Sequence, residues 1–278
     1  GDVSAFGAFQ YSRDDGWRDF SPSRLYNGYA DLGFDTAEGG LHLKIIGANT
    51  NLTGNGVSPI ELLAADRRAV FTWPDNGRSR YGRASLHLWV ALSPTTRIEA
   101  TLYAQQLTLR TMNGDAADIK GCEADDAAGL LCLETLGADD DGEEVQAILT
   151  DANGDPIADT LGGEGYGVLN RGRTKTKAMG ALVQIIDDRA LLGGINHFAI
   201  GVSYDTSRTR FDTSTELGAL TDDRSVQGLG AGRPGRLYRL LGRVRAGSNT
   251  DRARIVGRNR PPLEPCKDSA RRSDRHSA

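Results

Sequence analysis

Residues 83–105 read RASLHLWVALSPTTRIEATLYAQ, and this stretch decides the fold. From Ala84 to Leu92 every second residue is apolar, and after the turn at 93–96 the alternation resumes at Ile98. An apolar residue at every second position is typical of a β-strand with two different faces. Two such runs joined by a short turn that contains Pro94 therefore predict a hairpin of long strands.

The same alternation continues on both sides of this hairpin. It predicts seven long strands, whereas only residues 60–69, preceded by Pro59, have the pattern of a short helix. The predicted strands are 3–12, 24–35, 41–52, 79–92, 97–112, 168–186 and 195–211. The connections alternate in length, with short turns at 36–40, 93–96 and 187–194 and long links at 13–23, 53–78 and 113–167.

Tight turns at one end and long loops at the other are typical of a transmembrane β-barrel. Several of the runs exceed about 9–11 residues, the length that a tilted strand needs to cross a bilayer. A spanning sheet has to close on itself, because every backbone amide in hydrocarbon needs a partner. Single-chain bacterial barrels have even strand numbers. Seven strands therefore predict an incomplete barrel: an all-β, antiparallel, up-and-down transmembrane segment with long extracellular loops.

Polar side chains that alternate with the apolar ones are expected to face the lumen of such a barrel. These residues are Asn27, Asp31, His42, Lys44, Ser85, His87, Glu99 and Thr101. The apolar runs are far shorter than the roughly 18 residues of a spanning helix, so transmembrane helices are excluded. Glycine supplies 35 of 278 residues, about 13% against an ordinary value of about 7%. This surplus fits tight strand turns.

The net charge of −4 is the sum of unlike parts. Residues 115–164 hold 15 acidic side chains and one lysine, whereas residues 231–278 hold 13 basic and four acidic ones. The basic segment is rich in Arg, Gly and Pro and lacks strand alternation, and its single aromatic residue gives little support to nucleic-acid binding. We therefore divide the chain into 1–229 and 230–278. We interpret the second part as a disordered or non-native extension such as a frameshift would produce.

Two motifs of the acidic segment have a chemical interpretation beside a structural one. Cys122 and Cys132 lie ten positions apart with no further cysteine or histidine nearby, which favours a disulfide over a metal site. Asp151-Ala-Asn153-Gly-Asp155 resembles the start of a calcium loop, but Pro156 stands where that loop requires glycine. A turn closed by Asp and Asn side chains is therefore the better interpretation. We expect no bound metal and no cofactor.

Four cations occupy alternate positions of the sixth predicted strand: Arg171, Arg173, Lys175 and Lys177. If they face outward, they lie just above the apolar stretch that begins at Met179, where they would pair with lipid phosphates. A solvated strand end explains the pattern equally well. No phosphate loop, nucleophile elbow or zinc-binding helix is present in the sequence. We therefore expect no enzymatic activity and assign no catalytic residue.

Residues 1–229 resemble the barrel of the TonB-dependent outer-membrane receptors. The resemblance rests on Asp15-Gly-Trp-Arg-Asp-Phe-Ser21 and, more strongly, on the pattern from Gly54-Asn-Gly56 through Glu61-Leu-Leu63 and Asp66-Arg67 to Val70-Phe-Thr-Trp-Pro-Asp75. Leu169-Asn-Arg171 and residues 204–211 resemble neighbouring strands of that barrel. The resemblance covers only the early part of the barrel, without the plug domain that members of the family carry.

This resemblance implies a location and a set of partners. The chain would belong to the outer membrane of a Gram-negative bacterium, in contact with outer-membrane lipid. The intact receptor would import a large nutrient such as a siderophore, driven by a TonB-type energising protein, and the lumen-facing residues would contact water or the plug.

Two other classes of function stay open at this point. The chain would alternatively be a secreted or surface carbohydrate-binding, adhesin-like β protein that uses the acidic loop as its ligand site. An enzyme would rest on Glu61, Asp66 and Asp75, although carboxylates in such a loop more commonly satisfy backbone groups and neighbouring charges. Two packed sheets that share a dry core would argue against the barrel.

Overall fold

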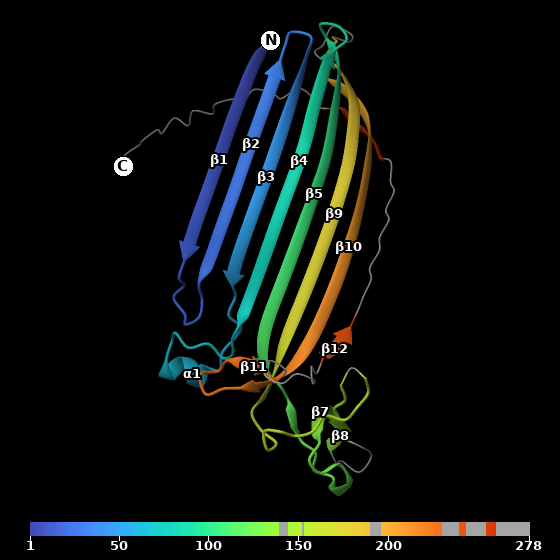
Figure 1. Ribbon diagram of the computed structural model, residues 1–278. Helices are drawn as coiled ribbons and strands as arrows, with labels where there is room; N and C mark the ends of the chain where they lie inside the picture. Colours follow the sequence, from blue (N-terminus) through green and yellow to red (C-terminus); the bar gives the residue numbers. More distant parts are fainter. Residues whose placement is uncertain (139–143, 152, 190–195, 230–238, 243–253, 260–278) are drawn as a thin grey trace, which may run out of the picture.

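One long antiparallel sheet dominates the protein (Figure 1). The computed structural model describes residues 1–138, 144–151, 153–189, 196–229, 239–242 and 254–259. Seven long strands pair in sequence order, each antiparallel to the one before it. They are β1 (Asp2–Asp14), β2 (Ser23–Asp35), β3 (Gly39–Thr53), β4 (Asp75–Ala91), β5 (Thr96–Ala116), β9 (Tyr166–Asp187) and β10 (Phe198–Leu220).

The predicted up-and-down arrangement of seven strands is confirmed, and each strand begins or ends beyond the alternating stretch. β4 starts at Asp75 instead of residue 79, and β10 continues to Leu220 instead of residue 211. The predicted helix is shorter: α1 covers Ile60–Ala65 only. It ends there because the Asp66 carboxylate accepts the backbone N–H of Arg68 at 2.9 Å, a local bond that competes with helix continuation.

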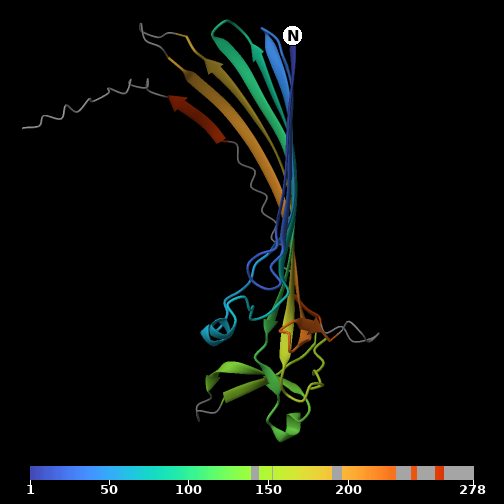
Figure 2. The ribbon, with the colours of Figure 1, turned by 90° about the vertical axis from the view of Figure 1, so that its left-hand side faces the viewer.

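The sheet is a single layer over most of its length (Figure 2). Short turns join β2 to β3 and β4 to β5 at one end, while α1 and the other long connections lie at the opposite end, here called the loop end. Within the described residues no second sheet covers either face of the long strands, except at the loop-side ends of β9 and β10, where the small sheet described below packs. β1 pairs with β2 alone, and its other edge has no described partner strand.

The link between β5 and β9 contains a small sheet that the alternation did not predict. It consists of β6 (Ile119–Gly121), β7 (Leu131–Ala138) and β8 (Glu144–Ile148), with a 3-10 turn, η1, at Asp125–Ala127. Its core joins the long sheet through the buried side chains of Ile119, Leu131, Ile157, Tyr166 and Leu217. The small sheet is therefore packed onto the ends of β9 and β10.

Three short strands pair with the side of β10 that β9 leaves open: β11 (Val226–Gly228), β12 (Arg239–Gly242) and β13 (Arg254–Asn259). The last two lie in the segment 230–278, for which the sequence indicated no strand, and the rest of that segment, with Cys266, lies outside the described residues. Residues 190–194 of the predicted turn, and residue 195, where the last predicted strand was expected to begin, also lie outside them. No helix among the described residues is long and apolar enough to span a membrane.

Candidate functional site: the two faces of the long sheet

All eight residues expected to face a lumen lie on one face of the long sheet, here called the polar face. Cross-strand register places Asp31 opposite Lys44 and Lys44 opposite Ser85. On a neighbouring rung, His42 lies opposite His87 and His87 opposite Thr101. Asn27 and Glu99 belong to the same face because side chains of a strand alternate between its two faces. The structure thus brings residues from four separate strands together.

A charged network on the polar face links β2, β3 and β4. His42 lies between two carboxylates, with Nδ1 3.1 Å from Asp31 and Nε2 2.9 Å from Asp35. The Trp89 indole donates a hydrogen bond to Asp35 at 3.0 Å, and Lys44 Nζ lies 3.7 Å from Asp31. The charges therefore compensate one another within the face.

The structure adds polar-face residues that the sequence analysis did not select. The Arg83 guanidinium lies over the Tyr103 ring, 4.4 Å from its centroid, and the Tyr103 hydroxyl donates a hydrogen bond to Asp205. Tyr81 donates to Gln105 at 3.0 Å. These residues occupy the same alternate positions as the predicted ones, so the alternation could have identified them. Their partners depend on the strand register.

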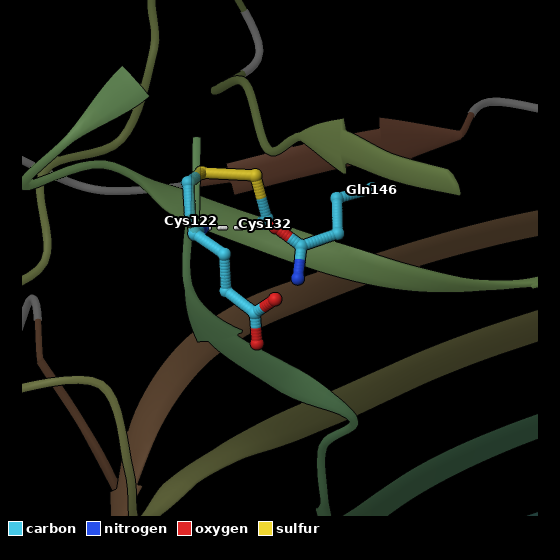
Figure 3. Close-up of a disulfide and its surroundings, with 4 residues drawn as sticks. Cys122, Cys132 and Gln146 are labelled. Carbon is cyan, nitrogen blue, oxygen red and sulfur yellow. Dashed lines mark hydrogen bonds between the residues drawn. A yellow bond between two sulfur atoms is a disulfide. The ribbon is translucent and has the colours of Figure 1, made fainter. Parts of the chain in front are cut away.

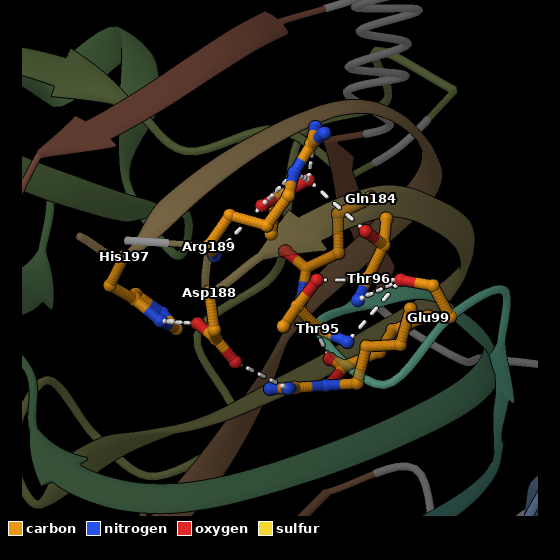
Figure 4. A network of polar contacts seen from close by, with 10 residues as sticks. Thr95, Thr96, Glu99, Gln184, Asp188, Arg189 and His197 are labelled. Atoms are coloured by element: carbon orange, nitrogen blue, oxygen red, sulfur yellow. Dashed lines mark hydrogen bonds and ion pairs between the residues drawn. The ribbon is translucent and has the colours of Figure 1, made fainter. Parts of the chain in front are cut away.

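A second polar network joins β5, β9 and β10 at the turn end (Figure 4). Gln184 donates to Glu99 at 2.8 Å, and Thr96 donates to Asp187 at 3.1 Å. The Arg189 guanidinium and backbone N–H both donate to the Asp187 carboxylate, which lowers the pKa of Asp187 to about 2. The imidazole of His197, which precedes β10, contacts the carboxylate of Asp188, which follows β9. This network fixes the turn-side ends of three strands.

The opposite face, here called the apolar face, carries almost only apolar side chains over several successive rungs. One rung from β1 to β10 consists of Val3, Phe34, Leu41, Leu88, Ala100, Val183 and Val202. The next consists of Ala5, Leu32, Leu43, Leu86, Leu102, Ala181 and Tyr204. Many of the large side chains are exposed, among them Val3 at 82% and Val202 at 50%.

The apolar face ends along a diagonal line. On β1 and β2 it extends to Tyr11 and Tyr26, whose rings lie 4.9 Å apart, whereas on β9 it ends at Met179, two rungs earlier. A level boundary crosses rungs diagonally when the strands are tilted to it, as in membrane barrels. On β4 the apolar positions run from Val90 to Gly82, about 27 Å at 3.4 Å per residue. A tilt of about 40° reduces this to about 21 Å, near the roughly 25 Å of a barrel's apolar band.

The two faces can be assigned to the curvature of the sheet. Tyr166 and Leu217, which anchor the small sheet, lie on the polar face by strand alternation. The small sheet therefore lies on the polar side. In Figure 2 the upper parts of β9 and β10 bend toward the side on which α1 and the small sheet lie. The polar face is thus the concave one.

Arg18 organises the loops at the loop end. Its guanidinium donates to the carbonyls of Gly56 and Ala69 at 3.1 and 2.6 Å and to Ser58 Oγ at 2.6 Å. The loop between β1 and β2 makes a further contact in this region: the Phe20 ring stacks on Trp73, which precedes β4, with ring centroids 4.3 Å apart. Two of the stretches that carry the family resemblance, residues 15–21 and 54–75, therefore contact each other.

The three carboxylates of the enzymatic alternative lie in different surroundings. Glu61 and Asp66 lie in α1 and at its end, and Asp66 serves as the helix-terminating acceptor. Asp75 is the first residue of β4, where burial and the nearby charge of Asp115 raise its pKa. A raised pKa alone assigns no chemistry, because acid–base catalysis needs a substrate pose. The helix end is a structural use of Asp66.

The small sheet is cross-linked and hydrogen-bonded. Cys122 and Cys132 form the predicted disulfide, and the Glu123 backbone N–H donates to Gln146 Oε1 at 3.0 Å (Figure 3). In the adjacent loop the Asp151 carboxylate accepts backbone N–H groups at 2.8 and 3.0 Å, which lowers its pKa. The calcium-like sequence is thus a turn closed by its own aspartate.

No protein-family model matches the sequence, and no curated protein matches it either. Among solved structures, the chain is similar to the ferric-catecholate import receptor Fiu of E. coli K12 in its open form, with a TM-score of 0.35 and 12% sequence identity. The match covers 92% of this chain and 46% of that chain, so this chain spans less than half the length of that receptor.

Proposed function

We propose that the chain forms part of a transmembrane β-barrel in the outer membrane of a Gram-negative bacterium. The barrel would belong to a receptor that takes up a large nutrient, such as a siderophore, with energy supplied by a TonB-type protein. The observation that carries the membrane part of the proposal is the apolar face. The uptake part rests on the family resemblance of residues 1–229.

The apolar face fits lipid better than water or a second sheet. A soluble monomer rarely exposes a contiguous apolar patch larger than a few hundred Å². Here the apolar rungs extend across seven strands, with Phe9 at 74% and Met179 at 61% exposure, and no described element covers them. A sandwich would place a second sheet on this face. The single layer therefore favours the membrane protein over the secreted adhesin-like alternative.

The opposite, concave face fits a polar interior. It carries charged and hydrogen-bonding side chains that contact one another within the face: His42 lies between two carboxylates, and the Arg83 guanidinium lies over the Tyr103 ring. Alternation of apolar outward and polar inward residues is the pattern of an outer-membrane barrel. The proposal assigns no catalytic residue and no cofactor to this face.

Neighbouring residues on opposite faces provide the test of the membrane part. Leu102→Trp and Thr101→Trp place an indole on the apolar and polar faces of β5 at nearly the same depth. In vesicles whose lipids carry brominated acyl chains, the Leu102→Trp protein should lose most of its added fluorescence, and the Thr101→Trp protein should lose little. Equal quenching of the two would contradict a lipid-facing apolar face.

The uptake part requires a separate experiment in cells. A strain that lacks the gene should accumulate less radiolabelled ferric siderophore than its parent, and the full-length gene should restore accumulation. Unchanged accumulation across a panel of ferric siderophores would remove the proposed substrate class without affecting the membrane assignment.

A further inference from the structure

Lysine and arginine side chains of β9 lie opposite arginine side chains of β10, just beyond the loop-side margin of the apolar face. Lys177 lies directly opposite Arg208, and Lys175 lies directly opposite Arg210. One rung further, the register aligns Arg78, Arg110 and Arg173, and there Asp212 of β10 lies opposite Arg173. Like charges in directly opposite positions destabilise a sheet. An anion held between them would convert this repulsion into attraction.

The first cation pair also borders a hollow in the apolar face. The hollow has a volume of about 590 Å³ and is lined by Gly82, Ala104, Met179 and Thr206, with Lys177 and Arg208 on its loop side. It arises because residues without bulky side chains lie beside the exposed Met179 side chain. A second hollow of about 450 Å³ shares Ala104 and Met179 with the first and continues over the apolar rungs below.

We propose that this surface binds a phosphorylated lipid, with its phosphates between the cations of β9 and β10 and its acyl chains in the two hollows. The inference rests on the proposed membrane location. Phosphate binds Lys and Arg through charge-assisted hydrogen bonds, and apolar hollows favour hydrocarbon. The Lys177–Arg208 pair lies at the junction of the two environments, as the headgroup of such a lipid does.

The continuity of charge and apolar surface selects a lipid over other polyanions. A nucleic acid would use the cations and leave the hollows empty, and a free phosphate ion would do the same. A lipid with two phosphates and several acyl chains contacts both parts of the surface. Each cation near a membrane surface contributes about 1 kcal/mol toward anionic lipid, which corresponds to about five-fold in affinity.

The test measures lipid binding by the full chain in micelles of a phosphate-free detergent. The probe is lipid A, an acylated disaccharide with two phosphates, and native mass spectrometry counts the bound molecules. The double variant Lys177→Gln/Arg208→Gln should bind about 25-fold more weakly than the wild type. Dephosphorylated lipid A should bind the wild type with similarly reduced affinity, and excess inorganic phosphate should not displace lipid A.

Two control proteins separate the cation site from folding and from total charge. Lys44→Gln/Arg83→Gln removes two cations from the polar face and should bind lipid A within about two-fold of the wild type. Lys177→Arg/Arg208→Lys preserves the charge and should do the same. Removal of the repulsion should leave the melting temperature of Lys177→Gln/Arg208→Gln unchanged or raised without lipid, which shows that this variant folds.

Equal affinity of wild type and Lys177→Gln/Arg208→Gln would overturn the inference, as would equal binding of phosphorylated and dephosphorylated lipid. These results leave the membrane proposal intact if brominated lipid still quenches the indole of Leu102→Trp selectively. If that quenching is absent, the membrane proposal and this inference fail together.

Discussion

Removal of a single hydroxyl group from Tyr166 should loosen the small sheet at the loop end. The hydroxyl donates to Asp159 at 2.6 Å and accepts the backbone N–H groups of Thr160 and Leu161 at 2.8 and 3.0 Å. The ring is buried among Ile119 and its neighbours, with 3% of the residue exposed. Tyr166→Phe keeps the ring and removes all three hydrogen bonds.

The expected loss of stability depends on which hydrogen bonds the three partner groups keep when the hydroxyl is removed. The Leu161 N–H retains the Asp159 carboxylate at 3.1 Å as an acceptor, so its loss is partial. The Thr160 N–H loses the tyrosine acceptor. Hydrogen bonds contribute about 0.5–1.5 kcal/mol each, and more when a charged group takes part. We expect Tyr166→Phe to lower the free energy of local opening by about 2–3 kcal/mol, which accelerates amide exchange about 30- to 150-fold.

Hydrogen exchange measured by mass spectrometry can resolve this change. Peptides that cover residues 117–165 should exchange faster in Tyr166→Phe, while peptides from β4 should be unchanged. Tyr26→Phe is the matched control, because Tyr26 is 41% exposed on the apolar face. Unchanged exchange at 117–165, or equal acceleration throughout the chain, would refute the role of this hydroxyl as the local anchor.

Leu131 and Leu133 provide a matched pair on β7, since the first is 0% and the second 41% exposed. Leu131→Ala should cost about 2–5 kcal/mol in denaturant unfolding of the small sheet, and Leu133→Ala less than about 1.5 kcal/mol. Replacing Cys122 and Cys132 by serine should cost up to about 3 kcal/mol by the same measurement, because the disulfide closes a short loop; no loss under oxidising conditions would contradict the cross-link. The pKa of Asp187 is lowered to about 2 from 3.8, so its stabilising contribution is complete above about pH 4 and disappears as the pH falls through 2. Protection factors at the turn end, from which the intrinsic pH dependence of amide exchange is removed, should fall between pH 5 and 1.5, and Asp187→Asn should remove most of this fall.

Alternation was sufficient to predict the strands within the apolar band and insufficient beyond it. From Ala84 to Leu92 the contrast between faces is strong because one face is apolar. Between Asp75 and Arg80 both faces of β4 are polar, so the pattern disappears although the backbone ladder continues. Strand ends are therefore the part of this fold that the sequence could not define.

Side-chain contacts between strands could not be predicted, because they depend on the strand register, which the sequence of one strand does not determine. Eight residues of the polar face were selected from the alternation alone, whereas the contact of Arg83 with Tyr103 on the same face depends on how β4 and β5 align. The same holds for Lys177 and Arg208, of which the sequence analysis selected only the first. The small sheet was missed for another reason: its short strands alternate over too few residues, and its core is completed by Tyr166 and Leu217 of the long sheet.

The open edge of β1 constrains the order of events during assembly. Along its 13 residues, about every second backbone group points away from β2 with no described strand beside it. In water these groups are hydrated, but in hydrocarbon each would remain without a partner at a cost of several kcal/mol. Entry into a bilayer therefore lowers the free energy of such a sheet only after another strand has paired with β1.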